Sequence, residues 1–191
     1  ASACSIPQTY KVTLDKQSGT GGTSEYYYQY NTKGTCYYYA SSALSTCTDS
    51  SDGQNITVPT RTGYTFGGYW TGKNGTGTMY VDSTGLTKNN LYTAVAGNTT
   101  LYAKWTGISY TVKYDANGGI GTTASSSHTY GTAKNLTTNG FSNGAKKFLG
   151  WSKTKTATTA TYSDGQSVKD LTTTDGDTIT LYAIWGNCEP C

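Results

Sequence analysis

The chain has 191 residues, of which 35% are hydrophobic and 13% are charged. Both fractions lie below the roughly 45–50% and 25% of average globular proteins, but 18 tyrosines and 4 tryptophans argue against disorder, because disordered chains are poor in aromatic residues. The formal net charge of +3 is too small to indicate nucleic-acid binding, and no apolar run reaches the length that spans a membrane.

One five-residue motif occurs twice. Residues 101–105 read Leu-Tyr-Ala-Lys-Trp, and residues 181–185 read Leu-Tyr-Ala-Ile-Trp. In each copy the Leu, Ala and Trp alternate with the other two residues, which is the period-2 pattern of a strand with one buried face. We therefore expect each motif to form the last strand of a small domain, with its Trp packed in the core.

Short strands and glycine-rich turns are predicted before the first motif. An alternating segment at 10–15, aromatic segments at 25–30 and 36–39, and a Gly-Tyr-Phe segment at 63–70 are typical of strands. A Ser/Ala-rich segment at 40–46 is expected to form a single helical turn. This pattern favours a small antiparallel or mixed sheet.

The second unit repeats these elements. Residues 110–115 repeat the opening strand, Phe148–Trp151 repeats Phe66–Tyr69, and residues 165–171 are expected to form a short helical turn. The first unit is longer between its opening strand and its Phe-x-Gly strand, so its Tyr- and Cys-rich segment is interpreted as a surface insertion. The expected core residues are Val12, Leu14, Phe66, Leu101, Ala103 and Trp105 in the first unit, and Val112, Tyr114, Phe148, Trp151, Leu181 and Trp185 in the second.

The repeat predicts a mainly β fold with minor helix (α+β) in two domains. We expect a leader or linker at 1–8, a first domain at 9–106, a second domain at 107–186, and the start of a cysteine-containing tail at 187–191. The link between the domains, Thr106 to Ser109, is only four residues long, which predicts limited swivel.

The five cysteines fall into two groups. Cys36 and Cys47 lie within the first unit, and a local disulfide between them would close a short loop and contribute ~3 kcal/mol. Cys188 and Cys191 form a CxxC, which can bind metal or perform redox chemistry. Because no second CxxC and no His lies nearby, we favour the start of a Cys-rich segment, and the pairing of Cys4, Cys188 and Cys191 stays open.

Three motifs in the same order resemble the InlB B-repeat, also called the Listeria–Bacteroides repeat. They are the opening Tyr114-Asp-Ala-Asn-Gly-Gly119, the middle segment from Pro59 to Tyr69, and the two closing motifs. Two copies cover residues 9–105 and 110–185. The first copy departs from the family pattern with Tyr69 in place of Trp, and with Lys16-Gln-Ser-Gly in place of Ala-Asn-Gly-Gly. The second copy lacks the Pro-Thr and Gly-Tyr elements.

The resemblance implies tandem β-grasp-like repeats in a bacterial protein that is secreted or held at the cell surface. Members of the family act as spacers, stalks or adhesive modules, and no catalytic activity is attached to them. The resemblance carries over no binding residues, because the shared motifs belong to the core and the turns. We expect no cofactor and no metal.

Residues capable of catalysis or metal binding are few. His128 is the only His, and we expect it to be solvated in a Ser-rich loop rather than paired with a nucleophile and a carboxylate. Asp175 and Asp177, like Asp49 and Asp52, could attract Ca²⁺. Neither pair has the spacing of a Ca²⁺-binding loop, so we interpret both as turns.

The tyrosines of the first unit give two alternatives. Adjacent strand residues face opposite sides, so the tyrosine runs cannot all be buried. Exposed tyrosines could form a surface for glycan or protein, whereas cross-strand Tyr and Thr pairs could instead stiffen the sheet, which is the interpretation we favour. The residues of this hypothetical ligand surface are Tyr26, Tyr28, Tyr30, Tyr37 and Tyr39.

The sequence therefore favours a non-catalytic extracellular repeat module that acts as a spacer, stalk or adhesive segment. The alternative is a binding module that recognises glycan or host protein through the Tyr-rich insertion. Its expected partners are a protein or glycan at the cell surface and neighbouring repeats of the same chain. Nucleic acid is not expected as a partner, and no membrane span is expected in this segment.

Overall fold

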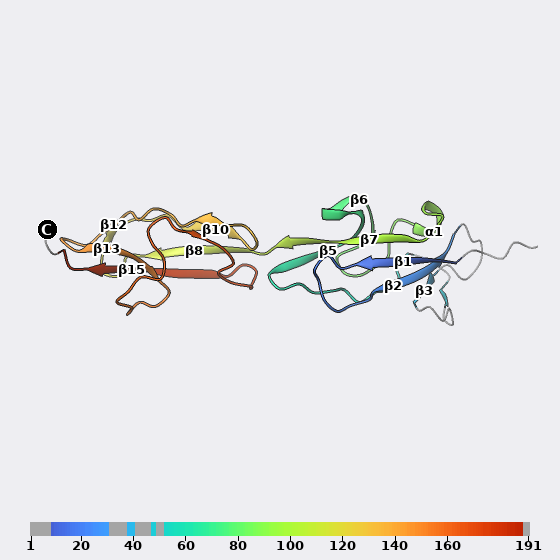
Figure 1. The fold of residues 1–191 in the computed structure, drawn as a ribbon, viewed down its shortest axis with the longest axis horizontal. Helices are drawn as coiled ribbons and strands as arrows, with labels where there is room; N and C mark the ends of the chain where they lie inside the picture. Colours follow the sequence, from blue (N-terminus) through green and yellow to red (C-terminus); the bar gives the residue numbers. More distant parts are fainter. Residues whose placement is uncertain (1–8, 31–37, 41–46, 49–51, 189–191) are drawn as a thin grey trace, which may run out of the picture. The chain divides into compact units, whose positions relative to one another are not determined.

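The computed structural model describes residues 9–30, 38–40, 47–48 and 52–188. The chain divides into two compact units, Ala1–Thr106 and Gly107–Cys191, which are called unit 1 and unit 2 and are described separately (Figure 1).

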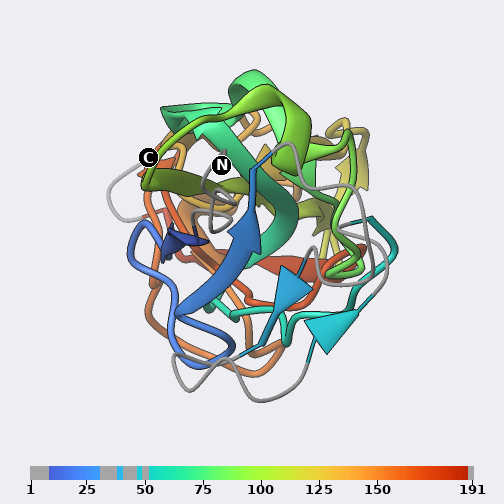
Figure 2. The same ribbon diagram turned by 90° about the vertical axis from the view of Figure 1, so that its right-hand side faces the viewer.

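A mixed sheet organises unit 1. Its first strand, β1, pairs antiparallel with β2 and parallel with β7. Over the described residues the strand order is β4-β3-β2-β1-β7-β5-β6, and Figure 2 shows the short β3 and β4 as light-blue and cyan arrows. The strands are β1 (Thr9–Asp15), β2 (Glu25–Gln29), β3 (Tyr38–Tyr39), β4 (Cys47–Thr48), β5 (Tyr64–Gly72), β6 (Thr76–Val81) and β7 (Thr99–Gly107). A 3-10 turn, η1 (Lys73–Gly75), and one helical turn, α1 (Leu91–Ala94), complete the unit.

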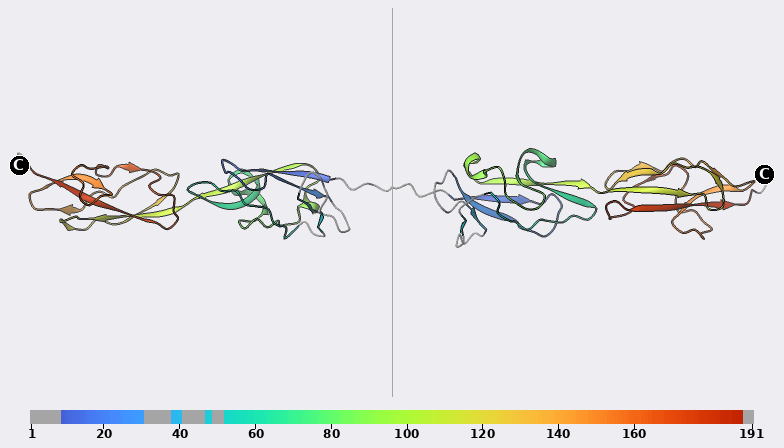
Figure 3. Two further views of the ribbon diagram at one scale, coloured as in Figure 1. Left: turned by 90° about the horizontal axis from the view of Figure 1, so that it is seen from below. Right: turned by 180° about the vertical axis from the view of Figure 1, so that it is seen from behind.

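The sheet of unit 2 has the same central arrangement. Its order is β10-β8-β15-β13, and the parallel pair β8–β15 lies side by side in the right-hand view of Figure 3. β11 pairs with β14 and β12 pairs with β9, which gives two further two-stranded antiparallel sheets. The strands are β8 (Ser109–Asp115), β9 (Ile120–Gly121), β10 (Ser126–Thr129), β11 (Lys134–Asn135), β12 (Phe141–Ser142), β13 (Lys147–Ser152), β14 (Ser167–Val168) and β15 (Thr178–Gly186).

The expected fold class, mainly β with minor helix, is confirmed. In each unit the opening and closing strands pair in parallel at the centre of the sheet. No α-helix lies within residues 107–188. The short helical turn expected at 165–171 is wrong, because Ser167 and Val168 pair with β11 instead and Val168 is buried. The helical turn expected at 40–46 falls on residues 41–46, outside the described ranges.

A glycine-containing irregularity brings two aromatic rings to one face in each core. Phe148 and Trp151 are three positions apart and would face opposite sides of a regular strand. The register of β13 against β15 shifts between Phe148 and Gly150, Gly150 has φ 133°, and the bypassed Leu149 is 42% exposed. The two rings then pack with centroids 4.9 Å apart, as expected of a bulge that re-aims side chains.

Unit 1 uses the same device at the equivalent place. Gly68 has φ 96°, and the rings of Phe66 and Tyr69 lie 5.1 Å apart. Tyr69 and Trp151 are both fully buried. Among the other aromatic residues expected in the cores, Phe66 is buried, whereas Trp105, Phe148 and Trp185 are partly buried and pack against the core clusters.

Candidate functional site

The loop after each opening strand folds over the closing Trp of the same unit. In unit 1 the indole Nε1 of Trp105 donates a hydrogen bond to the Lys16 carbonyl at 2.8 Å. In unit 2 the Nε1 of Trp185 donates to the Ala116 carbonyl at 2.9 Å. This loop, which begins at Asp15 or Asp115, is called the opening loop.

The last residue of the opening loop must be glycine because it lies against the indole ring. A Cβ atom at Gly19 would lie 2.5 Å from Cζ2 of Trp105, and one at Gly119 would lie 2.8 Å from Cζ2 of Trp185. Both distances are shorter than real Cβ contacts. The opening and closing motifs of the sequence therefore form one structural element.

The two opening loops share a backbone but differ in side chains. Gln17 and Asn117 both adopt the left-handed conformation, with φ 48° and 46°, and so do Ser18 and Gly118, with φ 72° and 93°. Asn and Gly adopt this conformation more readily than other residues. The opening loop of unit 1 therefore has the same backbone as that of unit 2, but its residues adopt the left-handed conformation less readily.

In unit 2 the Asn117 side chain is bonded to the body of the unit. Its Nδ2 donates to the carbonyls of Ala183 and Lys155, both at 2.9 Å. In unit 1 the corresponding region is a pocket of 340 Å³, which Ala103 and Trp105 line.

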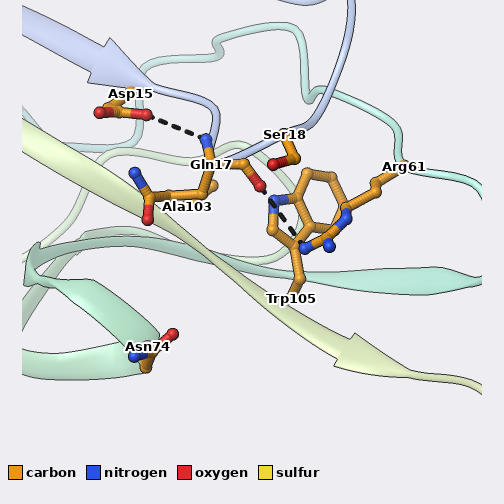
Figure 4. A pocket seen from close by; sticks show the side chains of 7 residues that line it. All are labelled: Asp15, Gln17, Ser18, Arg61, Asn74, Ala103 and Trp105. Atoms are coloured by element: carbon orange, nitrogen blue, oxygen red, sulfur yellow. Dashed lines mark hydrogen bonds between the residues drawn. The ribbon is translucent and has the colours of Figure 1, made fainter. Parts of the chain in front are cut away.

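Polar side chains from three segments make up the rest of this pocket, as Figure 4 shows. The opening loop supplies Asp15, Gln17 and Ser18, the segment before β5 supplies Arg61, and η1 supplies Asn74. These five residues and the two named above are called the opening-loop pocket.

Local interactions hold the charged groups of the pocket in place. The Asp15 carboxylate accepts the Gln17 N–H at 3.0 Å, and this bond, followed by the Gln17 side chain and the charge of Lys73, lowers the pKa of Asp15. The Arg61 guanidinium lies 3.9 Å from the centroid of the Tyr64 ring and contacts the Gln17 carbonyl at 3.5 Å. The pocket thus holds a carboxylate and a guanidinium in fixed positions.

The hypothetical tyrosine surface requires correction. Tyr26 and Tyr28 are 2% and 0% exposed, because the inward face of β2 packs them into the core, so neither can contact a ligand. Tyr30 is partly buried and its ring lies 6.5 Å from that of Tyr10. Tyr37 and the side chain of Tyr39 lie outside the described part of the chain.

The expectation that His128 is solvated is also wrong. His128 lies in β10 and is 2% exposed, because the alternation of the strand directs it inward, where its ring stacks on Tyr110 with centroids 5.3 Å apart. Its Nε2 lies 2.7 Å from Ser126 Oγ, which lies 2.8 Å from the Tyr114 hydroxyl. His128 Nδ1 has no hydrogen-bond partner in the structure, so this buried Ser–His pair lacks an orienting carboxylate.

The acidic and cysteine residues have simple structural roles where the structure describes them. Asp175 accepts the Ser109 N–H at 3.1 Å, and Asp177 accepts the Thr172 hydroxyl at 2.8 Å, while residues 175–176 form a turn. Cys188 is disulfide-bonded. The expected pair Cys36 and Cys47 lies outside the described side chains, as does Asp49.

The described residues contain no group of three or more His, Cys, Asp or Glu that could hold a metal ion. Within the same residues, no helix has the length and apolar character that crossing a membrane requires.

The sequence placed Ala103 and Trp105 in the core but did not predict the opening-loop pocket. Asp15, Arg61 and Asn74 are far apart in the sequence, and only the fold brings them together. One signal was available, namely the departure of Gln17 and Ser18 from the Asn-Gly of the family pattern.

Comparison with known proteins supports the repeat organisation. Residues 10–104 and 110–184 each match the family model of the Listeria-Bacteroides repeat domain. The comparisons with curated proteins and with solved structures found no match. The two expected copies are confirmed, and the chain belongs to the Listeria-Bacteroides repeat family as a tandem pair of its domains.

Proposed function

We propose that the chain is a non-catalytic extracellular module of a bacterial surface or secreted protein, where it acts as a spacer or an adhesive segment. The observation that carries this proposal is the tandem family match over residues 10–104 and 110–184. The disulfide at Cys188 supports an oxidising compartment. A protein or glycan at the cell surface and neighbouring repeats are the proposed partners.

The connection between the units supports the spacer role. β7 ends at Gly107 and β8 begins at Ser109, so Ile108 alone separates the two strands. Ile108 is 6% exposed and belongs to the core of unit 2, and its carbonyl accepts the Tyr130 N–H at 2.9 Å. The connection therefore contains no free linker, whereas flexible linkers of Gly and Ser behave as random coils.

An insertion tests the spacer role. Gly-Ser-Gly-Ser between Thr106 and Gly107 is expected to broaden the range of conformations that fits small-angle scattering of the full chain. The same insertion after Gly144, where the glycine has open space around it, serves as the control and is expected to change nothing. A native chain that is compact, or that is as variable as the first insertion, would contradict the spacer role.

Binding tests the adhesive role separately. The full chain is applied to immobilised glycans and to immobilised surface proteins. Saturable binding to either supports adhesion, and the absence of binding to all of them leaves the spacer as the function.

A further inference from the structure

We propose that the opening-loop pocket of unit 1 binds one ring of a neutral saccharide through the polar side chains of Asp15, Gln17, Arg61 and Asn74. This inference deepens the adhesive form of the proposed function and rests on it. The proposed ligand site is therefore this pocket, and not the Tyr-rich insertion that the sequence suggested.

The backbone of the opening loop provides the first argument. Gln17 and Ser18 occupy left-handed conformations that Asn117 and Gly118 occupy in unit 2, so the fold itself does not require Gln and Ser there. Non-glycine residues held in such conformations cluster at ligand clamps and other functional sites. Here the two side chains that incur this strain line the pocket.

The comparison of the two units provides the second argument. In unit 2 the Asn117 amide is bonded to two backbone carbonyls. In unit 1 the pocket beside Ala103 has a volume of 340 Å³, near the lower end of the roughly 300–1,000 Å³ of ligand pockets. This size suits a ligand of about one ring.

The chemistry of the lining selects the class of ligand. Asp15 accepts hydrogen bonds, Arg61 donates them, and the amides of Gln17 and Asn74 do both. Neighbouring hydroxyl groups of a sugar also donate and accept, so they match planar side chains that present two polar atoms each. Because the lining includes one carboxylate and one guanidinium, a ligand without net charge fits it better than an ion of either sign.

The lining is also held in place before any ligand arrives. Gln17 N–H fixes Asp15, the Tyr64 ring supports Arg61, and the Lys16 carbonyl orients the Trp105 indole. Groups that are already ordered lose little conformational entropy on binding.

Saturation-transfer NMR on the full chain tests the proposal with glucose, galactose, mannose and N-acetylglucosamine as probes. At least one of them is expected to receive saturation from the wild-type chain. Asn74→Gly deletes one amide of the pocket, and glycine readily adopts the φ of 61° found there, so the variant is expected to fold and to bind at least tenfold more weakly. Asn89→Gly, also at φ 61° but outside the pocket, is the matched control and is expected to bind as the wild type does.

A loop exchange separates binding from stability. The double change Gln17→Asn and Ser18→Gly gives unit 1 the opening-loop residues of unit 2. The thermal midpoint of unit 1 is expected to rise by about 4 °C, because both new residues suit the left-handed backbone, while saccharide binding falls at least tenfold. If the loop residues were only structural, the midpoint would rise and binding would not change.

Two results would overturn the proposal. One is the absence of saturation transfer to all four sugars, and the other is binding that persists in both pocket variants. Binding of a glycan that survives these variants would retain the adhesive function while rejecting this pocket. Failure of the adhesive function is recognised separately, by the absence of binding to all immobilised glycans and proteins.

Discussion

Two buried tyrosines in the core of unit 1 differ in what their hydroxyl groups contact. The Tyr28 hydroxyl lies 2.6 Å from the Val95 carbonyl and 2.7 Å from that of Gly97. The Tyr69 hydroxyl is buried without a hydrogen-bond partner in the structure. Burial, together with the nearby charge of Asp15, raises the pKa of Tyr69 far above its ordinary value, so this hydroxyl stays neutral.

Replacing each tyrosine by Phe is expected to have opposite effects. Tyr69→Phe removes a polar atom that has lost its water without gaining a partner, so the free energy of unfolding should stay unchanged or rise by up to ~1 kcal/mol. Tyr28→Phe leaves a partly buried carbonyl without its donor and should lower it by about 1–2 kcal/mol. Urea unfolding of both variants measures the difference. Equal losses in the two would show that the Tyr69 hydroxyl has a partner in solution.

At the level of single elements, the bulge in β13 depends on Gly150. A Cβ atom at Gly150 would lie 2.3 Å from the Tyr162 carbonyl oxygen, and φ there is 133°. Gly150→Ala is therefore expected to lower the free energy of unfolding by ~2–3 kcal/mol, because both the backbone of β13 and the neighbouring segment at Tyr162 must shift. Amide hydrogen exchange within residues 107–186 measures the loss.

The control for this prediction is Gly144→Ala. Gly144 also has a positive φ, of 56°, but nothing lies within 4 Å of a Cβ atom placed there. This variant should lose only about 1–2 kcal/mol, the cost of the left-handed conformation. Equal losses at the two glycines would indicate that the close carbonyl contributes nothing.

The link between the opening loop and the closing strand gives a further prediction. Trp185→Phe keeps a ring against Gly119 but removes the donor to the Ala116 carbonyl. The free energy of unfolding is expected to fall by about 1–3 kcal/mol, with faster amide exchange in the opening loop. Unchanged exchange at residues 115–119 would contradict a role of the indole N–H in holding this loop.

The strands were largely predictable, because alternation marks 10–15, 110–115 and both closing motifs whatever their partners. The bulge was not, since it depends on Gly150 leaving the regular strand conformation. The helical turn expected at 165–171 failed because Val168 gains burial and strand pairing with β11. The position of His128 was missed because a four-residue strand in a Ser-rich segment looks like a loop.

The candidate site was not predictable as a set. Asp15, Arg61 and Asn74 have ordinary neighbours in the sequence, and their proximity follows from the order of strands and loops around them. The tyrosines form conspicuous runs in the sequence, but the burial of Tyr26 and Tyr28 depends on which face of β2 meets the core. A run of aromatic residues therefore does not show which of them are exposed. That depends on which face of the strand packs against the core.

For the whole molecule, the two units should respond to acid in separate pH ranges. Burial, followed by the charge of Lys134, lowers the pKa of His128. Below about pH 6.5 the His128 side chain binds a proton in the unfolded chain, whereas in folded unit 2 it binds this proton only at lower pH. Unit 2 is therefore expected to lose stability as the pH falls from 7 to 5.

Unit 1 contains no His, and its acid sensitivity comes from carboxylates such as Asp82. Burial raises the pKa of Asp82, but hydrogen bonds from Thr84, Leu86 and Lys88 outweigh this effect and hold the pKa far below its ordinary value. This stabilisation is present above about pH 4 and is lost only as the pH falls further.

Amide protection factors at pH 7 and pH 5 measure the difference between the units. They are expected to fall in unit 2 and to stay constant in unit 1, and His128→Phe should remove most of the change. A parallel fall in both units would show that the acid response does not originate at His128.

The parallel pairing of opening and closing strands has a mechanical consequence. In each unit the chain enters through one strand of a parallel central pair and leaves through the other. Because the two strands run in the same direction, tension on the ends of a unit pulls them lengthwise past each other, in shear. The hydrogen bonds between them then bear the force together and must break together, whereas in a peeled hairpin they break one at a time. Each repeat is thus arranged to resist stretching along the chain.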